Sequence, residues 1–403
     1  MFQGIARGSY LGRYKRDSTA YNRPIAVKAR PGRNVTKPYR VIASATLVLL
    51  CSCGGDSNTG RGSENVVNIY NWADYIGPDT LKQFEIETGI KVNYDTYAAA
   101  ATVDVKLLTG NSGYDVVVHS NQFSSRLIDV GVYQKLDTSL LPNLKNLDPD
   151  TMQSIDIYEK VRGYYVPYHW GSTGYMWNVD MVNERLPGQS MDSSAVLFDP
   201  AILSKLADCG VSFLDETTST LPMALAYLGL DPNATDDESL LRIEELLLRV
   251  RPYVRYFSNE KFISDVPNKE LCLAMSWSGD YATSARRAKE AGIDINLQYV
   301  VPVEGGALWV DGLYIPSDAP HAANAHKFIN FLLRGDVAAG ISKEVEYANA
   351  NAASWEFLDE ETLNNPAIYP DAAAWKRMFA IDAADPVRER ARTRTLARVK
   401  SGL

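Results

Sequence analysis

The sequence predicts an α/β protein with parallel strands in two lobes. Strand and helix patterns alternate from about residue 66 to residue 130, and this alternation favours parallel strands joined by right-handed crossovers. About 350 residues follow an N-terminal export segment, which is long for one domain and suits two. A strand pattern at 307–315 looks like a return of the chain to the first lobe.

The first lobe is expected to begin with three strand–helix units. Its strands are expected at 66–70, 91–97 and 114–118, and its helices at 79–88, 98–108 and 122–130. Pro78 stands just before the first helix, while Gly89 and Gly131 stand where the first and third helices end. Proline suits the first turn of a helix and glycine suits the position after its end, so these residues support the boundaries.

The second lobe is expected to begin after the segment 164–168. A helix near residues 240–248 has its leucines and isoleucine on one face, and Asp236 or Asp237 would cap it. Strands are expected at 271–277 and 297–303, and the returning strand is followed by a helix at 321–333.

Cys53 ends an apolar segment that is too short to span a bilayer. The run 41–50 is followed by Cys51-Ser52-Cys53 and then by a stretch rich in Gly, Ser and Asn. This pattern is typical of a bacterial lipoprotein signal, so we expect removal of 1–52, lipidation of Cys53 and a flexible tether at 53–64. A Cys-x-Cys metal or redox pair is the alternative, but no further Cys or His lies nearby to complete such a site.

The expected mature chain is strongly acidic. Residues 1–52 hold ten of the 41 basic residues and one of the 49 acidic residues, which leaves 31 and 48 and a net charge near −17. This charge argues against nucleic acid as a partner and favours small cations. The basic stretch 387–400 is typical of a solvated helical face rather than an anion site.

Two cysteines, Cys209 and Cys272, lie beyond the export segment. In an oxidising compartment such a pair can form a disulfide, and two unpaired buried thiols are the alternative. Closing a loop of this length would restrict the unfolded chain by about 4 kcal/mol on the loop-entropy model.

The motifs of common enzymes are missing from the sequence. It contains no Gly-x-x-x-x-Gly-Lys, no His-Glu-x-x-His, no Gly-x-Gly-x-x-Gly after a strand and no Gly-x-Ser-x-Gly. The histidines, His119, His169, His321 and His326, show no metal-ligand spacing. We therefore expect no metal, no cofactor and no catalysis, and a hydrolase is disfavoured because no nucleophile–base pair stands out.

Aromatic and acidic residues recur together in the predicted strands or at their ends. The groups are Trp72 with Asp74 and Tyr75, Trp277 with Asp280, and Trp309 with Asp311. In α/β folds the carboxyl ends of the strands open into the ligand crevice. Carboxylates accept hydrogen bonds from ammonium groups and aromatic faces attract cations, so the three groups predict a site for an organic cation.

Four segments carry a family resemblance. They are Asn71-Trp72-Ala73-Asp74-Tyr75-Ile76, Cys209 to Asp215, Tyr347 to Asn351, and Arg392 to Gly402. With these segments the chain, from about Val66 to Leu403, resembles the periplasmic solute-binding proteins of ATP-driven polyamine importers, the putrescine- and spermidine-binding type. The resemblance implies a two-lobed type II periplasmic-binding-protein fold, with a mainly parallel sheet flanked by helices in each lobe and a ligand cleft between the lobes.

The resemblance also implies a set of site residues. Asp280 and Asp311 would hold ammonium groups while the aromatic rings enclose the methylene chain. The implied ligand-binding residues are Trp72, Ala73, Asp74, Tyr75, Ser120, Ser219, Trp277, Asp280, Trp309, Asp311 and Tyr347. Cys209 and Cys272 match the family's disulfide.

The implied organisation follows the same resemblance. The first lobe would comprise 65–166 and 307–345, the second lobe 167–306, and a C-terminal helical segment, 346–403, would pack on the second lobe. The protein would be a lipid-anchored monomer of the periplasm. It would capture a polyamine, putrescine first and spermidine second, and deliver it to the permease subunits of an ABC importer.

Two positions depart from the family pattern. Ala73 stands where the family has Ser or Thr, and Ser219 stands where it has a Glu. Losing one charge-assisted hydrogen bond would weaken the binding of a diamine by about tenfold to a hundredfold. Asp215 or Glu216 could replace the missing carboxylate if the loop shifts. A monoamine or amino-alkyl acid is therefore an alternative ligand, and a surface adhesin or sensor on the same scaffold is an alternative function.

Overall fold

The computed structural model describes residues 65–382 and 385–402. The predicted export signal, the lipidated Cys53 and the tether 53–64 lie outside the described residues. In the described part, the strands alternate with helices along the whole chain.

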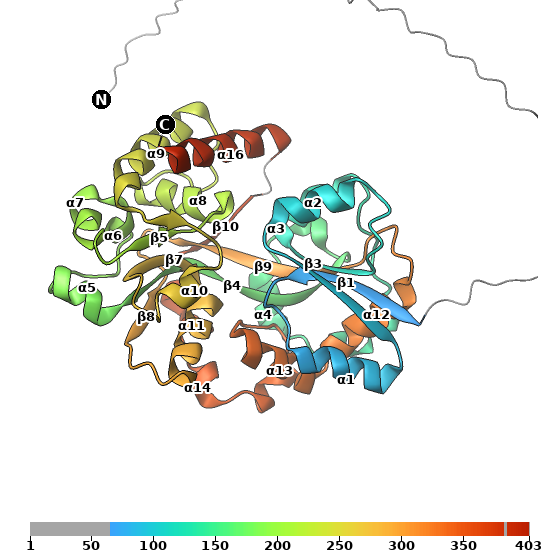
Figure 1. Ribbon diagram of the computed structural model, residues 1–403. Helices are drawn as coiled ribbons and strands as arrows, with labels where there is room; N and C mark the ends of the chain where they lie inside the picture. The colour runs from blue at the N-terminus through green and yellow to red at the C-terminus, as the bar shows by residue number, and fades with distance from the viewer. Residues whose placement is uncertain (1–64, 383–384, 403) are drawn as a thin grey trace, which may run out of the picture. The chain divides into compact units, whose positions relative to one another are not determined.

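Ten strands form the sheet of the described residues (Figure 1). They are β1 Val66–Trp72, β2 Lys91–Tyr97, β3 Val116–Ser120, β4 Tyr165–Asn178, β5 Val211–Phe213, β6 Tyr256–Phe257, β7 Leu273–Trp277, β8 Leu297–Val300, β9 Gly306–Tyr314 and β10 Met378–Ala380. Their order is β2-β1-β3-β9-β4-β7-β5-β6, with β10 paired to β9 and β8 to β4.

The sheet has a parallel set of strands on each side of two central antiparallel strands. β1 pairs in parallel with β2 and β3, and β5 pairs in parallel with β6 and β7. β9 and β4 run antiparallel to each other; β9 also pairs with β3, and β4 with β7. β4 and β9 therefore join the two lobes, and the predicted α/β class with a mainly parallel sheet in each lobe is confirmed.

Helices pack on both sides of these strands (Figure 1). The α-helices are α1 Pro78–Thr88, α2 Ala100–Leu108, α3 Asn121–Asp129, α4 Pro149–Ile155, α5 Val179–Arg185, α6 Ala195–Phe198, α7 Pro200–Leu203, α8 Thr217–Tyr227, α9 Asp237–Val250, α10 Phe262–Asp265, α11 Ser278–Glu290, α12 Ala322–Leu332, α13 Gly335–Val345, α14 Glu360–Leu363, α15 Ala372–Trp375 and α16 Pro386–Ser401. The 3-10 helices are η1 Thr138–Leu140, η2 Pro142–Asn146, η3 Glu159–Val161, η4 Ser204–Leu206, η5 Arg251–Tyr253 and η6 Ala352–Phe357.

The structure has the expected backbone conformation at one predicted helix end and the expected capping hydrogen bond at one predicted helix start. Gly89 ends α1 with a φ of 67°, a left-handed conformation that favours glycine. Asp236 caps α9, because its carboxylate accepts a hydrogen bond of 2.9 Å from the Ser239 backbone N–H. Of the two aspartates proposed as the cap, Asp236 is therefore the one that serves.

Each lobe has its own hydrophobic core. In the first lobe Ile69 packs into a cluster on one face of the sheet, while its neighbour Tyr70 packs into a cluster on the other face. This alternation follows from the period of two residues in a strand. In the second lobe a separate cluster includes Phe213 and Met275. β1 thus packs on both of its faces, as the central strands of α/β sheets do.

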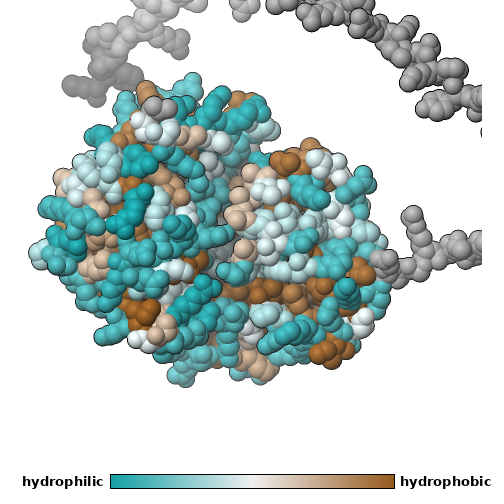
Figure 2. Space-filling view, viewed as in Figure 1, coloured by the Kyte–Doolittle hydropathy of each residue, from teal (hydrophilic) through white to brown (hydrophobic). Residues whose placement is uncertain are grey.

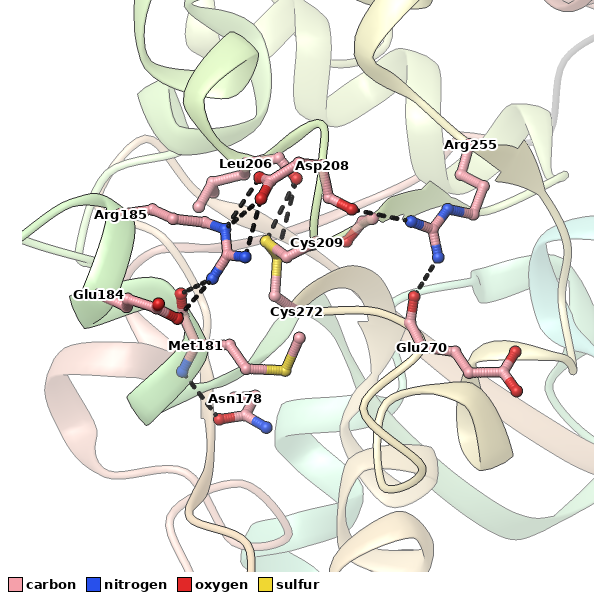
Figure 3. Close-up of a disulfide and its surroundings, with 11 residues drawn as sticks. Asn178, Met181, Glu184, Arg185, Leu206, Asp208, Cys209, Arg255, Glu270 and Cys272 are labelled. Carbon is pink, nitrogen blue, oxygen red and sulfur yellow. Dashed lines mark hydrogen bonds and ion pairs between the residues drawn. A yellow bond between two sulfur atoms is a disulfide. The ribbon is translucent and has the colours of Figure 1, made fainter.

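The second-lobe core contains the disulfide between Cys209 and Cys272 (Figure 3). The two Cα atoms lie 5.5 Å apart, and the bridge links the segment before β5 to the segment before β7. Near it, Arg185 pairs with Asp208 at 2.8 Å. The predicted disulfide is confirmed.

Two segments differ from the domain boundaries suggested by the sequence. β4 runs without interruption across residue 167, and all of its residues are buried. The segment 346–403 divides between the lobes: Trp170 N–H donates to the Ala348 carbonyl at 3.0 Å and η6 packs on α13, whereas α16 packs on α8 and α9. The part of this segment that packs on the second lobe is α16.

Candidate functional site

A cavity of about 530 Å³ lies between the two parallel sets of strands. Seen from the direction of Figure 1, the surface is hollowed between the second-lobe helices and the first-lobe elements (Figure 2). All eleven residues that the sequence suggested for the site line this one cavity: Trp72, Ala73, Asp74, Tyr75, Ser120, Ser219, Trp277, Asp280, Trp309, Asp311 and Tyr347. They come from the ends of β1, β3 and β7, from β9, from the first turns of α8 and α11, and from the segment after α13.

Asp311 is the buried carboxylate of the first lobe. It lies on β9 opposite Ser120 of β3, and the Ser120 hydroxyl donates a hydrogen bond to its Oδ1 atom. Asp311 is 4% exposed. Burial raises the pKa of its carboxyl to about 6, although the Ser120 hydrogen bond opposes this shift. A cationic ligand would stabilise the ionised form.

Asp280 is the corresponding carboxylate of the second lobe. It lies in the first turn of α11, and its Oδ1 atom accepts a hydrogen bond of 2.7 Å from the Tyr347 hydroxyl. Burial raises the pKa of Asp280 to about 7, the Tyr347 hydrogen bond and Arg287 oppose the shift, and Asp74 and Glu260 add to it. The hydroxyl of Tyr347 thereby connects the first-lobe segment to α11.

Aromatic rings surround these carboxylates. The ring centroid of Tyr347 lies 5.1 Å from that of Trp309 and 5.5 Å from that of Tyr75, and both pairs are edge-on. The rings of Trp72 and Tyr97 pack together with their centroids 4.3 Å apart. The indole N–H of Trp277 donates a hydrogen bond of 3.3 Å to the Ser219 hydroxyl. Ring faces of this kind attract ammonium groups and cover methylene chains.

Ala73 and Asp74 lie at the open edge of the cavity. The Ala73 N–H donates to the Tyr97 carbonyl at 3.0 Å, which fixes the turn after β1. Asp74 has a φ of 53° and a side chain that is 83% exposed, and its carboxylate lies 3.8 Å from the Arg287 guanidinium of α11. Asp74 therefore faces a second-lobe cation, whereas Asp311 and Asp280 are held by hydroxyl groups.

The structure distinguishes the two candidates for the missing carboxylate. Asp215 is bound by Lys400 at 2.6 Å and is not part of the cavity lining. Glu216 occupies the N-cap position of α8 without a side-chain capping hydrogen bond, and it lines the cavity. Burial raises the pKa of Glu216 to about 7, and Glu389 adds to the shift. Glu216 stands just before α8 and Ser219 lies in its first turn, and both line the cavity, so a carboxylate at either position can reach it.

Several lining residues were not suggested by the sequence. They include Gln122, Phe123, Thr173, Glu260, Lys261, Arg287 and Glu344. Glu260 follows the second-lobe strand β6, so the position of an acidic residue after a strand end was a usable signal for it. Thr173 lies within the continuous buried strand β4 and carried no such signal.

The cavity lining is acidic. Its carboxylates are Asp74, Glu216, Glu260, Asp280, Asp311 and Glu344, and its cations are Lys261 and Arg287. The formal charge of the lining is therefore −4. A recess of low dielectric with this charge concentrates cations and repels anions.

The described histidines do not line this cavity. Burial lowers the pKa of His119 and of His169 to about 3, so both are neutral, and neither lines the cavity. His321 pairs with Asp115 at 3.0 Å. Among residues 65–382 and 385–402 no group of His, Cys, Asp and Glu is arranged to hold a metal ion, and no helix has the length and apolar character of a membrane span.

Comparisons with known proteins agree with this geometry. Residues 79–370 match the model of a family described as bacterial extracellular solute-binding protein. The chain is 41% identical to the putrescine-binding periplasmic protein SpuD of Pseudomonas aeruginosa, over 89% of this chain and 98% of that protein. It is also 41% identical to the putrescine-binding periplasmic protein PotF of Escherichia coli, over 85% of this chain and 94% of that protein.

A solved structure has the same fold. It is a spermidine/putrescine ABC transporter protein from Listeria monocytogenes, 29% identical in sequence, with a TM-score of 0.74. The match covers 83% of this chain and 99% of that chain. The fold is therefore shared over nearly the whole of the solved chain.

Proposed function

Because this chain belongs to the bacterial extracellular solute-binding protein family, we propose that it captures a polyamine outside the cytoplasm and delivers it to an ABC importer. Putrescine is the first ligand to consider and spermidine the second. The observation that carries the proposal is the pair of carboxylates Asp311 and Asp280, each held by a hydroxyl group in a cavity that three tryptophans also line. The names of the two putrescine-binding relatives support the same choice.

The proposed binding mode assigns one role to each kind of residue. Asp311 and Asp280 accept hydrogen bonds from ammonium groups, and Trp277, Trp309 and Trp72 cover the methylenes between them. Burying four methylenes gains roughly 3 kcal/mol, and each ring contact about 0.5–2 kcal/mol more. After the costs of association, these contributions are consistent with binding at about micromolar concentration.

The cavity volume allows more than one polyamine. A diamine of six non-hydrogen atoms needs roughly 180 Å³ if each atom takes about the volume of a water molecule in liquid, and a triamine of ten needs roughly 300 Å³. The cavity of about 530 Å³ accommodates either, with room for water. Volume alone therefore does not select putrescine.

We propose that the protein binds its ligand without altering it. None of the described residues that line the cavity is a histidine or a cysteine, and the hydroxyls of Ser120 and Tyr347 donate to the two carboxylates that are proposed to hold the ammonium groups. Movement of the two lobes about β4 and β9, the strands they share, would open and close the cavity.

The proposed location is the membrane surface of the periplasm. The Leu-x-Ser-Cys pattern supports a lipid anchor at Cys53, on which the monomer would reach the permease subunits. A Cys53→Ser change is expected to move the protein from the membrane fraction to the soluble periplasmic fraction. Retention of the variant in the membrane fraction would contradict the anchor.

One observation supports a second ligand class. Ser219 stands where the family pattern has a Glu, and two cations, Lys261 and Arg287, line the cavity. An amino-alkyl acid would place its ammonium group on Asp311 and its carboxylate near these cations. The excess of six carboxylates over two cations favours the polyamine.

Calorimetric titration of the purified protein tests the proposal. Putrescine and spermidine are expected to bind at sub-millimolar concentration, while butylamine and 4-aminobutanoate bind more weakly by tenfold or more, because each leaves one carboxylate unpaired. Tighter binding of butylamine or 4-aminobutanoate would replace the polyamine with the second ligand class. A folded protein with no thermal shift in any of the four ligands would favour an adhesin or sensor function.

A further inference from the structure

Thr173 lies where β4 passes from one strand partner to the next. β4 pairs with β9 up to Ser172 and with β7 from Thr173 onward. Thr173 is also the one residue of β4 that lines the cavity. Thr173 therefore lies at the floor of the cavity, on a strand that both lobes share.

The two tryptophans of the cavity floor lie on the same face of β4 as Thr173. Trp277 is directly opposite Thr173 on β7, and Trp309 is directly opposite Gly171 on β9. Residues opposite each other in an antiparallel pair share a face, as do residues two apart in one strand. A Cβ atom at Gly171 would lie 2.5 Å from the Trp309 ring, so that ring covers Gly171 and reaches the neighbourhood of Thr173.

The hydroxyl of Thr173 has no partner within residues 65–382 and 385–402. Thr173 is 0% exposed, and its Oγ1 atom makes no hydrogen bond there. Among the other hydroxyls of the site, Ser120 donates to Asp311, Tyr347 donates to Asp280 and Ser219 accepts from Trp277. The hydroxyl of Tyr75 likewise has no partner in the described residues. A buried hydroxyl without a partner is costly, and such a group at a cavity wall is typical of a contact that a ligand completes.

The position of Thr173 indicates which part of the ligand it meets. In the sheet order β9-β4-β7, β4 lies between the strand that carries Asp311 and the strand that leads into α11 and Asp280. If these carboxylates take the two ends of the ligand, as the proposed function requires, Thr173 lies beneath its middle. A methylene there offers no hydrogen bond, whereas an internal amine offers N–H donors to the hydroxyl oxygen.

We infer that Thr173 is a specificity-determining residue, whose hydroxyl accepts a hydrogen bond from an internal amine and so favours a triamine over a diamine of equal length. The inference rests on the proposed function, and the cavity volume permits it. It adds to the two carboxylates a third polar contact that acts only on ligands with a nitrogen in the middle of the chain.

A cycle of two ligands and two proteins tests the inference. The ligands are spermidine and 1,8-diaminooctane, which has a methylene in place of the internal amine, and the proteins are the wild type and Thr173→Val. The loss of affinity on Thr173→Val is expected to be about tenfold larger for spermidine than for 1,8-diaminooctane. Thr173→Ser, which keeps the hydroxyl, is expected to stay within about threefold of the wild type for both ligands.

A second measurement separates a ligand contact from a structural role. Because Thr173→Val removes an unpartnered buried hydroxyl, the ligand-free variant is expected to melt at the wild-type temperature or about 2 °C higher. Equal losses of affinity for the two ligands, or a clear fall in melting temperature of the ligand-free variant, would overturn the inference and leave the polyamine function standing. Failure of the wild type to bind either amine would overturn the proposed function and this inference with it.

Discussion

The two carboxylates of the cavity differ in a way that burial alone does not explain. Asp311 is the more buried of the two, yet its pKa is raised to about 6, while the half-buried Asp280 has a pKa raised to about 7. Burial is the largest cause in both cases. The difference lies in the neighbours: a hydroxyl group donates to each carboxylate, but Asp280 also has Asp74 and Glu260 as like charges nearby.

This difference reflects how the two lobes build their walls. The first-lobe carboxylate lies within a strand, and the register of β9 against β3 sets its hydrogen-bond partner. The second-lobe wall is made of helix starts and loops, and it gathers the carboxylates Glu216, Glu260 and Asp280 with the cation Lys261. The first lobe thus supplies one carboxylate in a fixed position. The second lobe supplies a group of charges whose negative potential attracts a cation.

The largest expected effect is that of pH on affinity. Both carboxyls must ionise to hold a diammonium ligand, which itself stays charged below about pH 9. With carboxyl pKa values of about 7 and about 6, the affinity for putrescine is expected to fall by about a thousandfold from pH 8 to pH 5. Calorimetric titration at pH 5, 6, 7 and 8 measures this change. A difference in affinity of less than about tenfold between pH 8 and pH 5 would contradict the prediction.

The stability of the ligand-free protein is expected to change with pH in the opposite direction. The folded pKa values of Asp280 and Asp311 are raised, so between about pH 4 and pH 7 the folded state binds more protons than the unfolded state. These groups therefore stabilise the ligand-free fold at low pH, and that stability is lost as the pH rises through 6 and 7. Asp280→Asn is the matched control, because it should remove the part of both effects that is centred near pH 7.

The next effect in size is that of Asp311→Asn. The amide retains an oxygen for the Ser120 hydroxyl but cannot neutralise an ammonium group, so the affinity for putrescine is expected to fall about a hundredfold. Because a buried carboxyl with a raised pKa is removed, the ligand-free variant is expected to unfold at the wild-type temperature or above. An affinity within threefold of the wild type would show that the first-lobe wall does not carry the ligand charge.

A smaller effect is expected from restoring the family's carboxylate. Ser219→Glu adds a second carboxylate to the part of the cavity lining that contains Glu216, so the affinity for putrescine is expected to rise about tenfold, with no gain for butylamine. Glu216→Gln in the wild type is expected to lower putrescine affinity by a similar factor. If Ser219→Glu weakens binding while Glu216→Gln has no effect, the second-lobe wall depends on the Ser219–Trp277 hydrogen bond and not on its charge.

The sequence predicted the parts of the site that lie at strand ends. Trp72, Trp277 and Asp280 stand at or just after the ends of strands, and the carboxyl ends of the strands meet at one edge of the sheet, so their convergence followed from topology. Thr173 could not be predicted in this way. β4 is a continuous run of fourteen buried residues without alternation, and the face that meets the cavity depends on its pairing with β7 and β9.

The choice among Asp215, Glu216 and Ser219 was equally beyond the sequence. Asp215 is occupied by Lys400, which lies 185 residues further along the chain. Such a pairing is set by the packing of α16 on α8 and leaves no local pattern. The same is true of the C-terminal segment, whose division between the lobes depends on distant backbone hydrogen bonds.

The smallest expected effect is that of the pair between the lobes, Asp74 and Arg287. Both side chains are largely exposed and their charged atoms lie 3.8 Å apart, so the pair contributes about 0–1 kcal/mol. Asp74→Asn and Arg287→Gln are each expected to weaken putrescine binding by less than about threefold, and the difference from the wild type should vanish in 0.5 M salt. A loss above tenfold in Asp74→Asn alone would mean that Asp74 turns inward and holds the ligand beside Asp280. In that case the first-lobe wall would supply two ligand charges, and the contrast between the walls would not hold.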